Sequence, residues 1–110
     1  MAKIEPITKK DDRGNKIYSK NANGYEQFWE FDEKNHLTRW SDSNGLECIW
    51  EYDELSRPIF MKGPDGTEIH QKYKHNCIYQ YYSNGIIKTI DTNNRLVYEK
   101  DINGKEHYFD

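Results

Sequence analysis

Five Asn-Gly or Asp-Gly dipeptides recur along this 110-residue chain at nearly constant intervals. The intervals between successive glycines are 21, 21, 19 and 19 residues, counted over Gly24, Gly45, Gly66, Gly85 and Gly104. These dipeptides are the strongest short-range signals for a β-hairpin, because a type I′ turn requires positive φ at both central residues. The spacing therefore predicts a repeat of about 19–21 residues in which every unit is a hairpin.

A second set of turn residues lies halfway between the first. It reads Phe31-Asp32-Glu33-Lys34-Asn35, Tyr52-Asp53-Glu54-Leu55-Ser56 and Ile90-Asp91-Thr92-Asn93-Asn94. Residues 73–76 form a shortened, degenerate copy, and residues 11–15 form a preceding half-copy. Asp and Asn favour such corners because their side chains hydrogen-bond the local backbone and tolerate left-handed conformations.

Between the turns, apolar and polar residues alternate over segments of five to eight residues. Tyr25, Gln27, Trp29 and Phe31 point to one side of the first segment, while Glu26, Phe28 and Glu30 point to the other. Return strands are expected at 37–41, 57–62, 77–83 and 95–100. An alternation with period two, bounded by turn residues, is the signature of strands. We expect an all-β fold: an antiparallel β-meander of about nine or ten short strands in a single curled sheet. One domain covers 1–110, with 1–22 as a partial N-terminal cap repeat and 23–110 as the full repeats.

The composition supports a folded domain with a thin aromatic core. Charged residues make up 32% of the chain and the mean hydropathy is -1.15, but aromatic residues reach 15%, which is high for a disordered chain. A net charge of -3 is too balanced for direct nucleic-acid binding, and no apolar run predicts a membrane span. We therefore expect a cytoplasmic protein. The only two cysteines, Cys48 and Cys77, have no metal-binding spacing, and a buried free thiol is the favoured interpretation of Cys48.

Two of the units, residues 50–57 and 90–96, resemble the YD repeat of Rhs-type proteins. That pattern is Tyr-Asp, a short turn and then Arg-Leu or a similar pair; here Phe31 and Ile90 replace the tyrosine, and Lys74 replaces the aspartate of the third unit. The resemblance covers roughly residues 23–110. It implies a fragment of the β-hairpin wall of an Rhs cage, in the style of short free-standing repeat proteins of bacteria and phages. It brings no catalytic residues.

No catalytic or metal-binding spacing is present in the sequence. The GxSxG, P-loop, GxGxxG and HExxH patterns are all missing, so we expect no enzymatic activity, no cofactor and no metal. His70 and His75 could approach each other across a hairpin, with Cys77 or Glu68 as the nearest third ligand. Surface histidines are the favoured interpretation.

A column of glutamates is the first candidate binding feature. Glu26, Glu47, Glu68 and Glu106 each follow a turn glycine by two residues, and Glu30 and Glu51 lie on the same side. Equivalent residues of successive repeats should lie two strands apart, about 9.5 Å. One interpretation is an acidic surface that competes for the basic groove of a nucleic-acid-binding protein. The favoured alternative is a solvated face on which Arg57, Lys62 and Lys100 neutralise the glutamates. The column is interrupted at Ile87 and Lys72.

Aromatic residues are the second candidate feature. We expect Trp29, Trp50 and Tyr73 to stack in an interior row. Tyr81 and Tyr82 are adjacent and must point to opposite faces. The sheet should therefore expose aromatics, and the remaining candidates are Phe28, Trp40, Phe60, Tyr79, Tyr81 and Tyr82. Exposed aromatics suit protein contacts, sugar stacking or self-association. A two-sided core, formed when the sheet curls or forms a homodimer, is equally compatible with the pattern.

These features predict a non-enzymatic protein-binding module. Its most specific form is a phage or mobile-element inhibitor that blocks a host defence nuclease by surface occlusion, like an anti-CRISPR protein. The predicted partner-binding residues are Glu26, Glu30, Glu47, Glu51, Glu68, Trp40, Phe60, Tyr81 and Tyr82. Alternatives are an immunity protein that neutralises a cognate toxin, and a carbohydrate-binding module that uses Trp40, Tyr81 and Tyr82.

Overall fold

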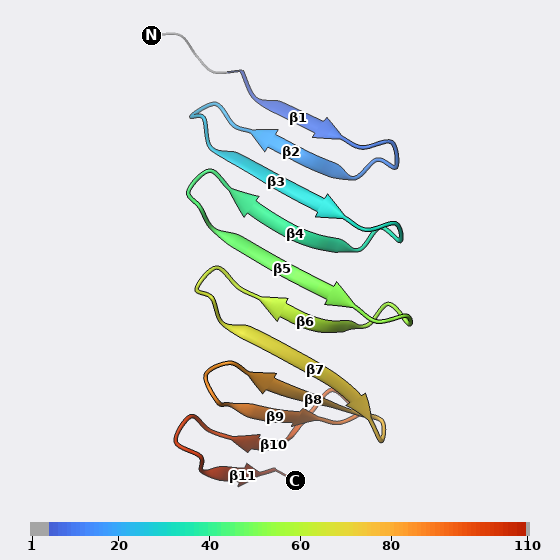
Figure 1. The fold of residues 1–110 in the computed structure, drawn as a ribbon, viewed down its shortest axis with the longest axis vertical. Helices are drawn as coiled ribbons and strands as arrows, with labels where there is room; N and C mark the ends of the chain where they lie inside the picture. Colours follow the sequence, from blue (N-terminus) through green and yellow to red (C-terminus); the bar gives the residue numbers. More distant parts are fainter. Residues whose placement is uncertain (1–4, 110) are drawn as a thin grey trace.

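The computed structural model describes residues 5–109, which form one open antiparallel sheet without helices (Figure 1). The strands are β1 (Ile7–Lys10), β2 (Lys16–Lys20), β3 (Glu26–Phe31), β4 (Leu37–Asp42), β5 (Glu47–Tyr52), β6 (Pro58–Lys62), β7 (Glu68–Lys74), β8 (Cys77–Tyr82), β9 (Ile87–Ile90), β10 (Leu96–Lys100) and β11 (Glu106–Tyr108). Strand order follows chain order throughout, which confirms the predicted all-β meander of hairpins. The eleven strands exceed the nine or ten expected, because residues 7–20 form a complete hairpin.

Nine of the ten connections share one turn geometry. In the turn from Asp53 to Arg57, the Asp53 N–H donates to the Arg57 carbonyl at 2.9 Å and the Ser56 N–H donates to the Asp53 carbonyl at 3.0 Å. The fourth residue has positive φ, 64° at Ser56. A three-residue loop of this kind is a type I turn followed by a left-handed bulge residue. The fourth residues are Gly14, Gly24, Asn35, Gly45, Ser56, Gly66, Gly85, Asn94 and Gly104.

The predicted type I′ geometry at the Asn-Gly and Asp-Gly sites is therefore wrong. Within residues 5–109 the Asn or Asp before each of these glycines does not have positive φ; only the glycine does. The one two-residue type I′ turn lies at the shortened copy between β7 and β8. There Lys74 pairs with Cys77, and His75 and Asn76 have φ of 53° and 61°.

Aspartate or asparagine begins seven of the nine turns and closes them with its side chain. Asp53 Oδ1 accepts the N–H groups of Leu55 at 3.0 Å and Arg57 at 2.9 Å. The hydrogen bond from the Arg57 backbone is the main reason that the pKa of Asp53 lies below its usual value. The seven first residues are Asp11, Asn21, Asp32, Asp42, Asp53, Asp91 and Asp101. The two classes of turn seen in the sequence thus share one geometry, which recurs at both ends of the strands.

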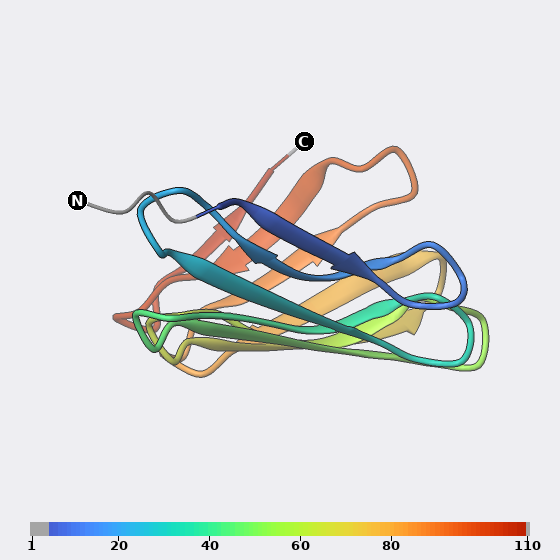
Figure 2. The ribbon, with the colours of Figure 1, turned by 90° about the horizontal axis from the view of Figure 1, so that it is seen from above.

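The sheet is a single layer. Its extents are 58 × 31 × 20 Å, and its radius of gyration is 18.3 Å, against about 13 Å for a compact domain of this length. Seen end-on, the strands rotate progressively and both ends of the sheet lie to one side of its middle (Figure 2). No hydrophobic side chain among residues 5–109 is buried. The expected aromatic core is therefore only a half-covered face.

Strand register assigns the side chains to two faces. The glutamate face carries Glu26, Glu30, Glu47, Glu51 and Glu68, and the tryptophan face carries Trp29, Trp40 and Trp50. Tyr73 shares the tryptophan face, but the predicted stacking of Trp29, Trp50 and Tyr73 is wrong, because rings two strands apart are about 9.5 Å apart. Cations cover two of these rings instead: Lys16 Nζ lies 4.6 Å from the Trp29 ring centre, and Arg57 Cζ lies 4.2 Å from that of Tyr73.

Candidate functional site

The five predicted glutamates lie together on one exposed face. Glu26 and Glu30 project from β3, Glu47 and Glu51 from β5, and Glu68 from β7. The Glu30 side chain is 60% exposed, so its carboxylate is available to a partner. Alternation along each strand is what places these residues on the same face.

Arg39 on β4 lies between two of these carboxylates. Its Nη1 is 3.1 Å from Glu30 Oε2, and its Nε donates to Glu47 Oε2 at 3.0 Å. The hydrogen bond to Glu47 is the largest cause that raises the pKa of Arg39 above its usual value. Sequence reasoning missed this residue and expected Arg57 on the face. That expectation is wrong, because Arg57 Nε donates to Asp53 Oδ2 of its own turn at 2.8 Å.

The other glutamates have neutral or basic neighbours. The Tyr18 hydroxyl donates to Glu26 Oε2 at 2.6 Å, and this bond raises the pKa of Tyr18. Glu68 lies directly opposite Lys62, and its Oε1 is 3.7 Å from His70 Nε2. Glu51 faces Phe60 and makes no ion pair within residues 5–109. The face is therefore striped with charge of both signs.

Charge is nevertheless segregated along the sheet. Strands β3–β5 place four glutamates on this face against Arg39, whereas β6–β8 place three lysines on it against Glu68. The lysines are Lys62, Lys72 and Lys74. Lys72 Nζ lies 5.7 Å from the Tyr81 ring centre, a cation–π contact. Between β3 and β8 the glutamate face thus has an acidic half followed by a basic half, and Lys20 on β2 lies directly opposite Glu26.

The predicted aromatic residues do not form one site. Phe60 and Tyr81 flank His70 on the glutamate face, and the Phe60 and His70 rings are 4.9 Å apart. Trp40 and Tyr82 lie on the tryptophan face, where the register pairs them with Trp29 and Ile69. The carbohydrate trio of Trp40, Tyr81 and Tyr82 is therefore divided between faces. Phe28 and Tyr81 are the most exposed rings of the glutamate face apart from Tyr108, at 40% and 39%.

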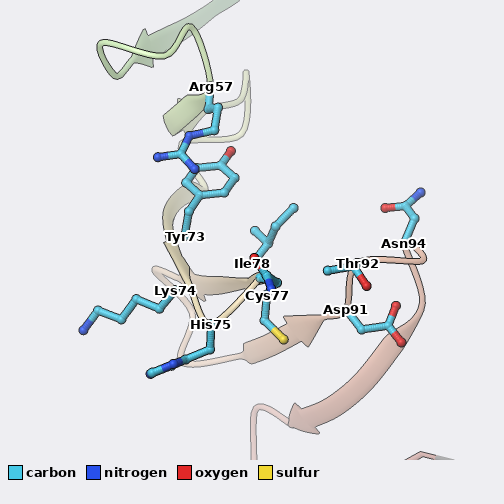
Figure 3. Close-up of a pocket in the computed structure, with 10 residues that line it drawn as sticks. Arg57, Tyr73, Lys74, His75, Cys77, Ile78, Asp91, Thr92 and Asn94 are labelled. Carbon is cyan, nitrogen blue, oxygen red and sulfur yellow. The ribbon is translucent and has the colours of Figure 1, made fainter.

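A groove of about 430 Å³ opens beside the short β7–β8 hairpin (Figure 3). The Arg57 and Tyr73 pair forms one wall, and the turn that begins at Asp91 forms the other. His75 and Cys77 point in different directions (Figure 3). In the part of the chain that the structure describes, no three His, Cys, Asp or Glu residues are placed to hold a metal ion. Cys48 is a free thiol, as predicted, but it is half-buried and not buried; this partial burial raises its pKa.

No protein-family model matches the chain, and no curated protein matches its sequence. Residues 5–109 contain no helix of the length and apolarity needed to cross a membrane. Inference about function therefore depends on the chemistry of the two faces.

Proposed function

We propose that this protein is a non-enzymatic protein-binding module that occludes a surface of its partner with the glutamate face. The observation that carries the proposal is the exposure of Phe28 and Tyr81 among charged side chains on one broad face. Aromatic residues and arginine dominate the energetics of protein interfaces, and polar residues surround them. The face extends over 58 × 31 Å, and a standard interface of about 800 Å² per partner needs less than half of that area.

The acidic half of the face supports a specific class of partner. Four glutamates against Arg39 on β3–β5 complement a basic groove, such as the nucleic-acid channel of a nuclease. The protein would then be an inhibitor carried by a phage or another mobile element, acting in the host cytoplasm on a defence nuclease in the manner of an anti-CRISPR protein. The resemblance to YD repeats supports the bacterial or phage context. An immunity protein for a cognate toxin would use the same face and differ in the partner captured.

Affinity capture from bacterial host lysate, followed by mass spectrometry, tests this function. The test variant changes Glu47 and Glu51 on the face to glutamine. The matched control changes Glu33 and Glu54, which lie in exposed turns, and so removes the same charge elsewhere. We expect the unaltered chain and the control to retain a nuclease complex that the face variant loses. Capture that is equally strong with all three chains would exclude the glutamate face as the binding surface, and capture of a toxin would establish the immunity function.

A further inference from the structure

The tryptophan face is aromatic, half-covered and continuous along the sheet. It carries all three tryptophans of the chain, and none of its apolar side chains is fully buried. A sheet with one apolar face normally covers that face with a second layer. Besides the tryptophans, its apolar residues include Phe31, Tyr52, Met61, Tyr73, Ile78 and Ile90.

Most charged groups on this face already have partners within the chain; Lys10 on the edge strand β1, which pairs with Lys16, is exposed and has no anion beside it among residues 5–109. Asp42 Oδ2 accepts the Tyr25 hydroxyl at 2.8 Å, while its Oδ1 accepts two turn N–H groups. Lys88 Nζ lies 3.9 Å from Glu99 Oε1. His107 contacts Asp101 at 3.0 Å, and Lys16 and Arg57 lie on aromatic rings. A second layer over β2–β11 would therefore leave none of these groups without its partner, which is the usual penalty for burying ions, and Lys10 on the edge strand can keep its ammonium in water.

The accessible surface of the chain exceeds that of a compact protein by about the area of one interface. It measures 7943 Å², against about 6,400 Å² for a monomer of 13.2 kDa. The excess of about 1,500 Å² falls within the ~1,000–2,500 Å² that each partner buries in an obligate dimer. Exposure of the single layer is thus large enough to sustain a stable dimer.

The spacing of the rings favours a second copy of this chain over an unrelated partner. Equivalent large side chains recur every second strand, about 9.5 Å apart, from Trp29 through Trp50 to Tyr73. A second copy has the same period, so its side chains fall between these along the whole face when the two sheets pack about 10 Å apart. A two-fold arrangement of this kind is closed and ends at the dimer.

We infer that two copies of this protein pack their tryptophan faces together in an isologous homodimer, which leaves both glutamate faces exposed. This arrangement does not depend on the proposed function, because it needs no other partner. It supplies the second apolar layer that the single chain lacks. It also presents two identical partner-binding surfaces on opposite sides of one particle.

Sedimentation equilibrium of the full chain, from nanomolar to high micromolar concentration, tests the inference. We expect a mass of twice 13.2 kDa for the unaltered chain. Trp50→Glu and Met61→Glu, on the tryptophan face, should reduce the mass to that of one chain. Ile49→Glu is the matched control, because it adds the same charge beside Trp50 but on the opposite face. Far-UV circular dichroism shows which variants remain folded.

Tryptophan fluorescence of the unaltered chain gives a second readout. It requires no substitution, so misfolding of a variant cannot affect it. All three tryptophans lie on the proposed interface, so dilution should shift their emission to the red and increase quenching by acrylamide in step with the fall in mass. A chain that is monomeric at high micromolar concentration would overturn the inference. So would a dimer that Ile49→Glu dissociates, or one that dissociates with no change in fluorescence. Glu47→Gln with Glu51→Gln should remain dimeric, which separates this test from that of partner binding.

Discussion

Replacing Gly45 by alanine measures the energetic requirement of the turn that recurs along the sheet. Gly45 is the fourth residue of the turn between β4 and β5 and has φ of 86°. A Cβ at this position meets no heavy atom within 4 Å, so the substitution introduces no steric clash. The left-handed conformation itself costs about 1–2 kcal/mol for a residue with a side chain. Reduced freedom of the unfolded chain offsets about 0.4–1 kcal/mol of that.

The net destabilisation should therefore be about 1 kcal/mol. For 110 residues the entropy of unfolding is ~0.23 kcal/mol/K, so the melting temperature should fall by about 4 °C. The melting temperature of Gly45→Asn should fall less, because Asn35 and Asn94 occupy the same position in other turns with φ of 67° and 63°. Calorimetric melting of the two variants beside the unaltered chain makes the comparison. If Gly45→Ala melts at the temperature of the unaltered chain, or if asparagine is no better than alanine, positive φ does not control these turns.

Three further outcomes follow from individual contacts. Folding lowers the pKa of Asp53. The stability that this carboxylate contributes should therefore be full above its unfolded pKa of about 4 and be lost as the pH falls through the lower folded pKa. Asp53→Asn should flatten that part of the curve of melting temperature against pH. The Tyr73 hydroxyl donates to the Pro58 carbonyl at 2.6 Å, so Tyr73→Phe should lower the free energy of unfolding by about 1 kcal/mol in urea titrations, and an unchanged midpoint would contradict this. Burial raises the pKa of Cys48, so alkylation of this thiol should begin at higher pH than that of a free cysteine, as peptide mass spectrometry can measure.

Local sequence signals were sufficient to predict the fold class. Regularly spaced turns and period-two alternation act within a few residues, and antiparallel neighbours follow directly from short connections. The type of turn was mispredicted, because Asn-Gly serves both a two-residue loop and the last part of a three-residue loop. The aspartate or asparagine at the first position distinguishes most of the loops: Asp42 precedes Asn44-Gly45 by two residues and closes the turn with its side chain.

The sequence predicted the face of only some candidate residues, because β-bulges change which face a side chain occupies. A bulge between Glu30 and Phe31 pairs Glu30 with Arg39 and Trp29 with Trp40. Without that extra residue, Arg39 would lie on the tryptophan face and Trp40 on the glutamate face, since a shift of one residue reverses every side chain. The faces of the glutamates depend on alternation within their own strands. Which residues of the neighbouring strands lie beside the glutamates depends on β-bulges, and the sequence pattern does not predict where these bulges occur.

Two features of the molecule coincide at the short β7–β8 hairpin. The groove opens there, and the series of tyrosine hydrogen bonds that link successive repeats ends there. Each strand contacts only its neighbours in sequence, so contacts between adjacent repeats carry stability that a core would otherwise supply. At one end of the strands these contacts include two hydrogen bonds from tyrosine hydroxyl groups. Tyr52 donates to the Leu37 carbonyl at 2.8 Å, and Tyr73 donates to the Pro58 carbonyl at 2.6 Å. The series ends at Tyr73, because the next turn has only two residues and Ile90 occupies the next ring position. The groove therefore lies where this series of tyrosine hydrogen bonds ends, beside the turn that is shortened to two residues.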